Sequence, residues 1–433
     1  MIWNKEIECM SRQEMRKLQS EKLIQLVHHV YTNVAFYRRR MDEMGVKPSD
    51  IQSIDDIVKL PFTYKTDLRD NYPYDLFAAP MKDIVRVHAS SGTTGKPTTV
   101  GYTKNDIENW REVVARCLTM AGISSNDIMQ VSYGYGLFTG GLGVHYGAET
   151  IGCTVVPISG GNTRRQLQLM SDFGTTVLAC TPSYALHLGD ALEEFGYTLA
   201  DMKLKIGVFG AEPWTENMRL ELEKKLGIKA HDIYGLSEIM GPGVANDCIY
   251  HAGLHIHEDH FYPEIVHPDT KEALADGTEG ELVFTTLTKE GIPLLRYNTR
   301  DLSTLNRKTC ECGRTLVRMK KITGRSDDML IIRGVNLFPS QIEHVLLEMG
   351  ETSAHYMLYV DRENNLDTLE LKVELDESKM ADTIRDLQNL SKKISHALNS
   401  AIGLSVKVTL VEPKTIARSE GKVVRVIDKR KAP

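Results

Sequence analysis

The pattern of apolar and polar positions changes character along the chain. Near the N-terminus, between residues 12 and 44, apolar residues recur at close to helical spacing among many charged residues, and the run ends at Gly45. This pattern predicts one amphipathic helix over the whole stretch. Its apolar positions are Leu18, Leu23, Leu26, Val27 and Val30.

From about residue 85 to residue 320, short apolar runs alternate with helical patterns such as residues 215–226. The runs are IMQVSY, CTVVPI, TVLACT, IGVFG and ELVFTTL. Alternating strands and helices are typical of an α/β core with a substantial parallel sheet. We therefore expect an α/β fold whose large N-terminal domain, residues 1–326, contains several sheets.

After Asp327 the pattern predicts a smaller α+β arrangement. A helix is expected near 340–349, a strand at HYMLYV, a turn at Asn364-Asn365 and an alternating strand at TLELKVEL. A helix from about 377 to 400, a strand at VKVTLV and a basic tail follow. Residues 327–433 are therefore expected to form a C-terminal lid domain of ordinary size, and the missing low-complexity linker favours a tight hinge before it.

The composition limits the classes of molecule that the chain is expected to bind. With 433 residues, 42% of them hydrophobic, the chain can bury a large core, and a net charge of −6 provides no basic surface for nucleic acid. The charged N-terminus lacks the apolar core of a leader peptide, and no apolar stretch is long enough to span a membrane. We expect a cytoplasmic protein with small-molecule partners, no nucleic acid and no membrane. The oligomeric state stays open, and a homodimer is compatible with the sequence.

The chain has seven cysteines, an odd number scattered along the sequence, which does not suggest a disulfide framework. Three of them lie in polar loops rich in glycine and histidine. Cys248, Cys310 and Cys312 with one histidine would give a Cys₃His site, the composition of a structural zinc site. We expect His255 as the fourth ligand and His257 as the alternative. Three free cysteines remain a second interpretation, because the C-x-C spacing is tighter than usual in zinc sites.

A loop rich in serine, threonine and glycine, ASSGTTGKPTT at residues 89–99, directly follows the strand-like run IVRVH. Its backbone and hydroxyl donors could wrap a polyphosphate, and Lys96 adds a positive charge. A P-loop of the Walker type is disfavoured because Ser90 replaces its first glycine and Pro97 replaces its serine or threonine. Taken alone, the loop could be an ordinary turn.

Further motifs follow in a fixed order. They are YGYGLFTGG at 133–141, GAEPW at 210–214, YGLSE at 234–238, RYNTRDL at 296–302, ITGRSDDMLIIRGVNLFPSQIE at 322–343 and RSEGKVVRV at 418–426. Together with the loop at 89–99, this series resembles the adenylate-forming superfamily of acyl-CoA synthetases, adenylation domains and luciferases. Within that superfamily the series is most similar to the phenylacetate:CoA ligases.

The resemblance implies an AMP-forming acid:CoA ligase that uses ATP, Mg²⁺ and coenzyme A. A carboxylate would attack the α-phosphate of ATP, and the CoA thiol would then displace AMP from the acyl adenylate. Both steps depend on positioning and on neutralising negative charge. The implied substrate is an aryl acid, foremost phenylacetate. The alternatives are another aromatic or short aliphatic acid, or a non-catalytic nucleotide-binding regulator.

The resemblance also implies roles for individual residues at the nucleotide. Glu238 would ligate Mg²⁺, Tyr234 would stack on adenine, Asp301 would accept hydrogen bonds from the ribose hydroxyls, and Arg325 would support the sugar and phosphate. The remaining expected nucleotide-binding residues are Ser90, Ser91, Gly92, Thr93, Thr94, Gly95, Lys96, Gly210, Ala211, Glu212 and Asp232.

Other roles implied by the resemblance concern the acid, the hinge and the lid. Asp327 matches the family's hinge, Gly334 lies where the CoA arm passes, and Lys422 matches the lysine that serves adenylate formation, so that Lys422 and Glu238 are the expected catalytic residues. The expected acid pocket contains Tyr133, Tyr135, Phe138, Gly140 and Gly141.

Overall fold

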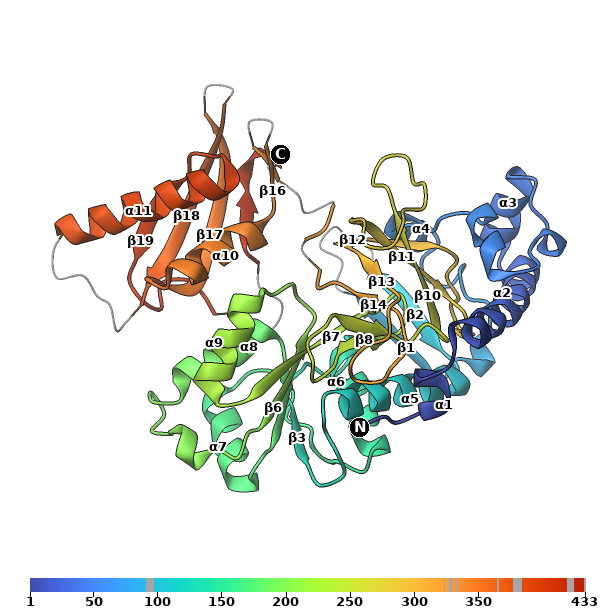
Figure 1. Cartoon of the computed structure of the whole chain (residues 1–433), viewed down its shortest axis with the longest axis horizontal. Coiled ribbons are helices and arrows are strands. Elements are labelled where there is room, and N and C mark those ends of the chain that lie inside the picture. The colour runs from blue at the N-terminus through green and yellow to red at the C-terminus, as the bar shows by residue number, and fades with distance from the viewer. Residues whose placement is uncertain are drawn as a thin grey trace.

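The chain folds into a larger part and a smaller part, and the smaller part is built from its C-terminal residues (Figure 1). The structure is a computed structural model that describes residues 1–90, 97–322, 324–326, 330–332, 335–363, 366–376, 384–418 and 424–431. Within these ranges, no helix has both the length and the apolar composition needed to cross a bilayer.

The N-terminal segment is a pair of helices and not the single helix predicted for residues 12–44. The chain leaves the helical conformation at Val34, which is extended, and a second helix starts at once. The break has a packing reason, because it lets both helices bury apolar residues in the same core. The helices of this region are α1 (Lys5–Glu8), α2 (Arg12–Asn33), α3 (Ala35–Glu43) and α4 (Lys65–Asp70).

A nine-stranded sheet forms the centre of the larger part, in the order β13-β14-β9-β8-β7-β6-β5-β3-β4. Its parallel half confirms the expected α/β core. The parallel strands are β3 (Ile128–Val131), β4 (Thr154–Val156), β5 (Val177–Cys180), β6 (Ile206–Gly210) and β7 (Lys229–Leu236).

Helices cover both faces of this parallel half (Figure 1). Side chains alternate along the strands, so that Val208 joins the hydrophobic cluster on one face and Phe209 joins the cluster on the other. Burial on both faces explains why these strands are continuous apolar runs in the sequence. The helices are α5 (Lys104–Met120), α6 (Gly140–Thr150), α7 (Thr163–Phe173), α8 (Pro182–Ala191) and α9 (Glu216–Leu226).

The strands that follow β7 are antiparallel. The run ELVFTTL, which the sequence pattern grouped with the parallel core, forms β11 in a separate antiparallel sheet of order β10-β11-β12. No helix connects β10, β11 and β12, and parallel pairing needs a long crossover connection. The antiparallel strands are β8 (Gly241–Asp247), β9 (Leu254–Ile256), β10 (Phe261–Val266), β11 (Gly280–Thr286), β12 (Tyr297–Ser303), β13 (Leu305–Asn306) and β14 (Arg318–Met319).

The C-terminal part has its own hydrophobic cluster, contributed by residues between Leu330 and Val406. Its main sheet has the order β19-β18-β17-β20. The tail predicted only as basic adds β20 to this sheet, parallel to β17, while the predicted turn at Asn364-Asn365 lies outside the described residues. The elements are β15 (Leu330–Ile332), β16 (Val335–Leu337), α10 (Pro339–Met349), β17 (Thr352–Glu363), β18 (Leu366–Leu375), α11 (Ile384–Ile402), β19 (Lys407–Val411) and β20 (Val426–Asp428).

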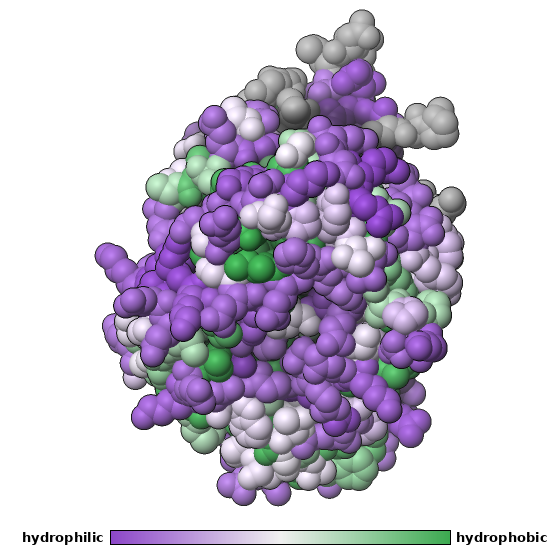
Figure 2. Space-filling model, turned by 90° about the vertical axis from the view of Figure 1, so that its right-hand side faces the viewer, coloured by the Kyte–Doolittle hydropathy of each residue, from purple (hydrophilic) through white to green (hydrophobic). Residues whose placement is uncertain are grey.

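Short elements complete the fold. A hairpin of β1 (Arg86–Ser90) and β2 (Thr98–Tyr102) flanks the predicted phosphate loop. On the face seen in Figure 2 the surface is largely hydrophilic, and hydrophobic residues occur there in small scattered patches. The 3₁₀ helices are η1 (Pro48–Asp50), η2 (Ile54–Lys59), η3 (Met81–Asp83), η4 (Leu199–Asp201) and η6 (Lys429–Lys431).

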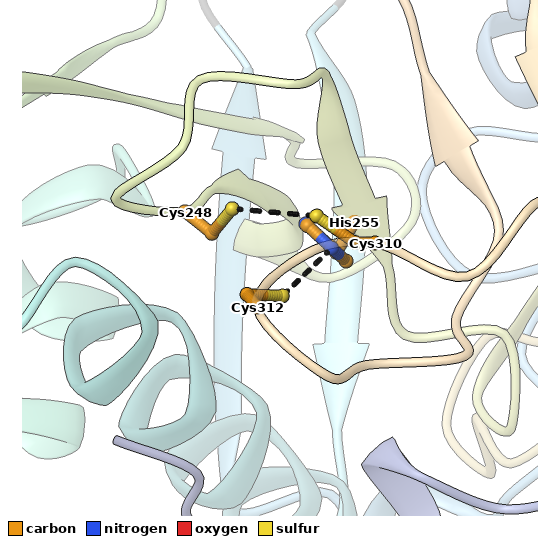
Figure 3. A group of neighbouring side chains, drawn as sticks. All are labelled: Cys248, His255, Cys310 and Cys312. Atoms are coloured by element: carbon orange, nitrogen blue, oxygen red, sulfur yellow. Dashed lines mark hydrogen bonds between the residues drawn. The ribbon is translucent and has the colours of Figure 1, made fainter.

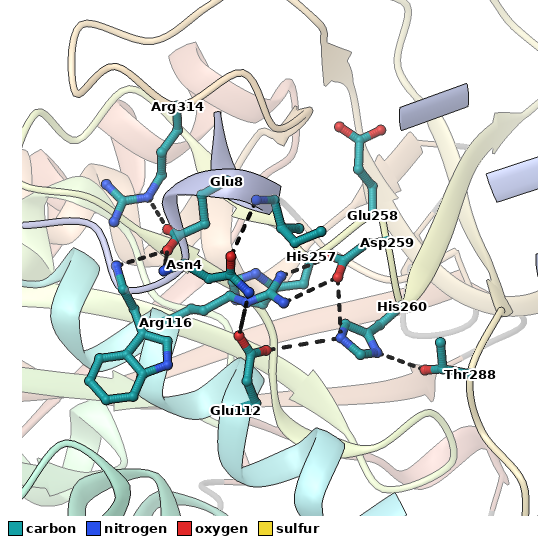
Figure 4. Close-up of polar contacts among 12 residues, drawn as sticks. Asn4, Glu8, Glu112, Arg116, His257, Glu258, Asp259, His260, Thr288 and Arg314 are labelled. Atoms are coloured by element: carbon teal, nitrogen blue, oxygen red, sulfur yellow. Dashed lines mark hydrogen bonds and ion pairs between the residues drawn. The ribbon is translucent and has the colours of Figure 1, made fainter. Parts of the chain in front are cut away.

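A buried polar network fixes the N-terminal segment to the core (Figure 4). Glu8 pairs with Arg314, and both side chains are almost fully buried. Farther along, Arg116 donates to both carboxylate oxygens of Asp259, at 2.9 and 3.2 Å, and His260 lies 3.2 Å from the same carboxylate. Although burial raises it, the pKa of Asp259 stays well below its usual range because His260 and Arg116 are close. Asp259 is therefore a buried anion that depends on its partners.

We predict that Arg116→Met lowers the free energy of unfolding by about 3–5 kcal/mol, because it leaves the Asp259 charge buried without the guanidinium that donates to both of its oxygens. Denaturant unfolding measures this. Arg39→Met is the control, since the Arg39–Glu43 pair is exposed at both ends and should contribute less than about 1 kcal/mol. Equal losses in the two variants would contradict the assignment.

Candidate functional site

The carboxyl end of β6 meets β7 so closely that a side chain could not fit. A Cβ on Gly210 would lie 2.1 Å from the carbonyl oxygen of Ile233, and the next residue, Ala211, has a positive φ of 72°. The following Glu212 accepts a 2.8 Å hydrogen bond from the backbone N–H of Ser183 at the start of α8. The GAEPW turn is thus fixed at the end of the sheet where α/β proteins bind ligands.

Three of the predicted motifs converge beside this turn. The hydroxyl of Tyr234 donates a 2.6 Å hydrogen bond to Oδ2 of Asp301, and Nη1 of Arg325 lies 3.7 Å from Oδ1 of the same carboxylate. Asp301 and Arg325 also pair through their backbones. Burial and the neighbouring Asp301 carboxylate raise the pKa of Tyr234 well above its usual range, so its proton stays on the hydroxyl. These contacts join YGLSE, RYNTRDL and ITGR into one group.

Glu238 lies in the turn after β7 and is only 5% exposed. Its Oε1 is 3.2 Å from Nζ of Lys65, which comes from α4. The sequence reasoning missed Lys65, because it belongs to no motif and lies far from Glu238 along the chain. Lys65 thus places a partly exposed ammonium beside a buried carboxylate.

Asp232 lies deeper on β7. Burial raises its pKa to about 6, and Lys321 opposes this shift. Nζ of Lys321 is 4.0 Å from Oδ2 of Asp232 and 3.8 Å from the centre of the Trp214 ring. Trp214 belongs to the GAEPW motif, whereas Lys321 belongs to none of the motifs. The sequence therefore did not indicate that Lys321 lies beside Asp232.

The start of the predicted phosphate loop lies against the aromatic segment 133–141. The backbone N–H of Ala89 donates to the carbonyl oxygen of Leu137 at 3.1 Å, and Nδ1 of His88 is 3.0 Å from the same oxygen. Ser90 ends β1, where it pairs with Thr98. The other predicted residues of the loop, Ser91, Gly92, Thr93, Thr94, Gly95 and Lys96, lie outside the described residues.

The residues predicted to line an acid pocket occupy different environments. Tyr133 is buried, and its neighbours include Asp232 and Glu212. The hydroxyl oxygen of Tyr135 is 3.1 Å from Nδ1 of His145, whereas the Phe138 side chain is 43% exposed. Gly140 and Gly141 begin α6, and a Cβ on Gly141 would lie 2.7 Å from the carbonyl oxygen of Gly134. Tyr133 is therefore the aromatic side chain of this set that lies near Asp232 and Glu212.

The three loop cysteines and His255 form a compact cluster (Figure 3). One ligand atom from each residue lies within 4.8 Å of the others. Cys248 Sγ is 3.8 Å from Cys310 Sγ, and Cys312 Sγ is 3.4 Å from Nε2 of His255. The alternative ligand, His257, contacts the thiol of Cys117 instead, at 3.3 Å. The geometry favours His255, and three thiols with one imidazole fit a tetrahedral zinc ion.

Three further predicted residues lie outside the described residues: Asp327, Gly334 and Lys422. The flanking residues Ser326 and Arg425 are described. The backbone N–H of Ser326 donates to the carbonyl oxygen of Arg300 at 2.8 Å, and the guanidinium of Arg425 stacks 4.5 Å from the centre of the Tyr356 ring.

Comparison with known families finds two matches along the chain. Residues 13–287 match the AMP-binding enzyme family, and residues 334–430 match the AMP-binding enzyme C-terminal domain. The first of these matches spans more than half of the chain.

Several characterised relatives match almost the entire chain. A phenylacetate-coenzyme A ligase of Escherichia coli (strain K12) is 53% identical over 426 residues, which cover 98% of this chain and 97% of the relative. A phenylacetate-coenzyme A ligase of Thermus thermophilus is 51% identical over 445 residues, which cover 100% of both chains.

Solved structures agree with the fold. A 2-hydroxyisobutyryl-CoA ligase in the postadenylation state, in complex with 2-HIB-AMP, gives a TM-score of 0.94 at 30% identity and covers 99% of this chain and 92% of that chain. The same ligase in the thioesterification state, with 2-HIB-AMP and CoA, gives a TM-score of 0.74 at the same identity and the same coverage.

We predict that Tyr234→Phe lowers the free energy of unfolding by about 2 kcal/mol, because the variant loses a buried hydrogen bond to a carboxylate. Denaturant unfolding monitored by fluorescence measures the loss. Tyr250→Phe serves as the control, since Tyr250 is 49% exposed and its substitution should change stability by less than about 0.5 kcal/mol. A Tyr234→Phe variant as stable as this control would show that the hydrogen bond to Asp301 contributes nothing.

Proposed function

The chain belongs to the AMP-binding enzyme family and is an AMP-forming acid:CoA ligase that uses ATP and CoA, and we propose that phenylacetate is its acid substrate. The observation that carries this proposal is the identity of 51 to 53% with four phenylacetate-coenzyme A ligases over nearly the full chain. The buried Tyr133, which lies near Asp232 and Glu212, supports the proposal, because an aromatic ring can pack against an aryl acid.

Tyr234 and Asp301 are proposed to hold the adenosine. The hydrogen bond between them fixes the Tyr234 ring at the end of β7, where one face can stack on adenine. A carboxylate offers about four acceptor positions. Asp301 can therefore accept hydrogen bonds from ribose hydroxyls while it still accepts the hydrogen bond from the Tyr234 hydroxyl. Arg325 is proposed to support the sugar and the phosphate from the other side of Asp301.

Glu238 is proposed to hold Mg²⁺, which supplies positive charge to the phosphates of ATP. The donor chemistry fits because Mg²⁺ prefers carboxylate oxygen, and the ion would take the place beside the buried Glu238 carboxylate that the Lys65 ammonium occupies at 3.2 Å. Lys65 keeps the Glu238 charge compensated and can turn toward the phosphates. The loop with Ser90 and Lys96 is proposed to enclose those phosphates, since β1 and the 133–141 segment bring its start to this site.

A structural zinc ion is proposed for the cluster of Cys248, His255, Cys310 and Cys312. The three cysteines come from two loops and His255 from strand β9, and the structure brings their ligand atoms within 4.8 Å of one another. Three thiolates and an imidazole form a closed set of ligands without a position for substrate. The ion would hold these loops together and take no part in the reaction.

Residues 327–433 are proposed to act as a mobile lid that turns about Asp327, with Gly334 beside the CoA arm. Two states of one ligase support this division. The TM-score with its postadenylation state is 0.94 and falls to 0.74 with its thioesterification state at the same sequence identity. Because the same ligase is compared in both states, the lower TM-score reflects a different arrangement of that ligase's domains. The separate hydrophobic cluster of residues 330–406 supports a lid that moves as one unit.

We predict that phenylacetate gives the highest kcat/KM in a panel of acids assayed with ATP, Mg²⁺ and CoA. Formation of AMP and thioester is measured for phenylacetate, indoleacetate, a hydroxycinnamate and a short aliphatic acid, and phenylacetate should exceed the aliphatic acid at least about 100-fold. A different best acid would overturn the substrate assignment alone. Absence of acid-dependent AMP formation with every acid would instead favour a nucleotide-binding regulator.

We predict that Cys310→Ser combined with Cys312→Ser removes about one zinc ion per chain, because two of the four proposed ligands are lost. Elemental analysis of protein purified without chelator measures this. Cys180→Ala is the control, since Cys180 is buried in a different cluster and should leave the zinc content unchanged. Equal zinc contents in the wild type and the double variant would refute the Cys₃His site.

We predict that Lys422→Ala reduces adenylate formation by several orders of magnitude and leaves the conversion of supplied acyl adenylate to thioester within a few-fold of wild type. When a carboxylate attacks a polyphosphate, a lysine between the two anions stabilises the transition state, and the second half-reaction lacks this need. Lys429→Ala is the matched control in the same tail, because Lys429 pairs with Asp361 at 3.6 Å. A parallel loss of both half-reactions in Lys422→Ala would contradict the division of roles.

A further inference from the structure

A second group of metal-ligating side chains lies apart from the cysteine cluster. It consists of His231 on β7, Asp247 at the end of β8 and His251 in the loop that follows. One ligand atom from each lies within 4.8 Å of the others. Nδ1 of His251 contacts Oδ2 of Asp247, and the rings of His231 and His251 are stacked with their centres 5.0 Å apart. The two groups share no residue.

Two polar atoms of this group are buried without a hydrogen bond. Nδ1 of His231 and Oδ1 of Asp247 have no partner within the part of the chain that the structure describes, and their residues are 2% and 3% exposed. An unpaired buried polar atom destabilises the folded state, and such atoms in native proteins usually have a partner. A cation between the two imidazoles and the carboxylate would supply one.

A cavity adjoins the group and gives an ion access to it. Its volume is about 370 Å³, and Asp247 and His251 are part of its lining together with Glu216 and Arg318. Three protein ligands leave at least one coordination position of a tetrahedral ion open. That position can face the cavity, where water can complete the coordination.

We propose that His231, Asp247 and His251 form a second metal site that binds a divalent first-row transition ion such as Zn²⁺. Two imidazoles and one carboxylate suit such an ion, whereas Mg²⁺ and Ca²⁺ prefer sites made of oxygen ligands. Asp247 directly precedes Cys248, and His251 lies between Cys248 and His255. Two ions would then fix the connection between β8 and β9, one bound by the Cys₃His cluster and the other by His231, Asp247 and His251.

The test counts metal ions site by site in the full chain. Protein is stripped with a chelator, reloaded with Zn²⁺, desalted and analysed for zinc. We expect about two zinc ions per wild-type chain, about one in His251→Ala and about one in the Cys310→Ser/Cys312→Ser variant. His344→Ala is the matched control with about two ions, since His344 also faces an acidic residue four positions away, Glu348 at 3.7 Å.

Cobalt distinguishes the sites directly. The Cys310→Ser/Cys312→Ser variant loaded with Co²⁺ should show ligand-field absorption and lack the thiolate-to-cobalt charge-transfer bands of the wild type. His231→Gln, which keeps a polar side chain of similar size, should lose the same ion as His251→Ala. The proposal is overturned if His251→Ala and wild type carry equal zinc, or if the cysteine variant binds no cobalt. Zinc lost in His251→Ala but unaffected by the cysteine substitutions would support this site and refute only the Cys₃His site.

Discussion

The close packing of backbone at the carboxyl end of β7 is the constraint on which the rest of the site depends. A Cβ on Gly210 would lie 2.1 Å from the carbonyl oxygen of Ile233, and one on Gly235 would lie 1.9 Å from that of Gly241. Glycine at these positions lets β6 and β8 approach β7 from opposite sides, one parallel and the other antiparallel. The chain can then place Tyr234 and Glu238 at one edge of the sheet, next to the GAEPW turn.

The proposed metal ligands and the proposed nucleotide-binding residues share strands β7 and β8, since His231 directly precedes Asp232 on β7. Tyr234 on β7 pairs with Ala245 on β8, and β8 then leads into Asp247 and Cys248. Ions at that end would stabilise the connection between β8 and β9 and leave the nucleotide site without a metal–thiolate group. The buried ion pair Arg116–Asp259 likewise links α5 to the segment between β9 and β10.

Much of the fold and of the site was accessible from the sequence, for physical reasons. Strands buried on both faces are continuous apolar runs, and β3, β5 and β6 were predicted from such runs. The motifs placed Tyr234, Asp301 and Arg325 at one site, which the structure brings together. Apolar composition gave no information on strand direction, so the pattern did not distinguish β11, which lies in an antiparallel sheet, from the parallel strands. Lys65, Lys321 and His231 escaped notice because tertiary packing alone places them next to their partners.

Affinity for a stable mimic of the acyl adenylate tests most directly whether the carboxyl end of β7 is the nucleotide site. Calorimetric titration with the sulfamoyl analogue of phenylacetyl adenylate compares wild type with Asp301→Ala and with Asp276→Ala, whose carboxylate is 47% exposed and pairs with Arg307. The account predicts that Asp301→Ala weakens binding on the order of 100-fold, about 2.7 kcal/mol, while Asp276→Ala binds as wild type does. Equal dissociation constants for folded Asp301→Ala and wild type would contradict it.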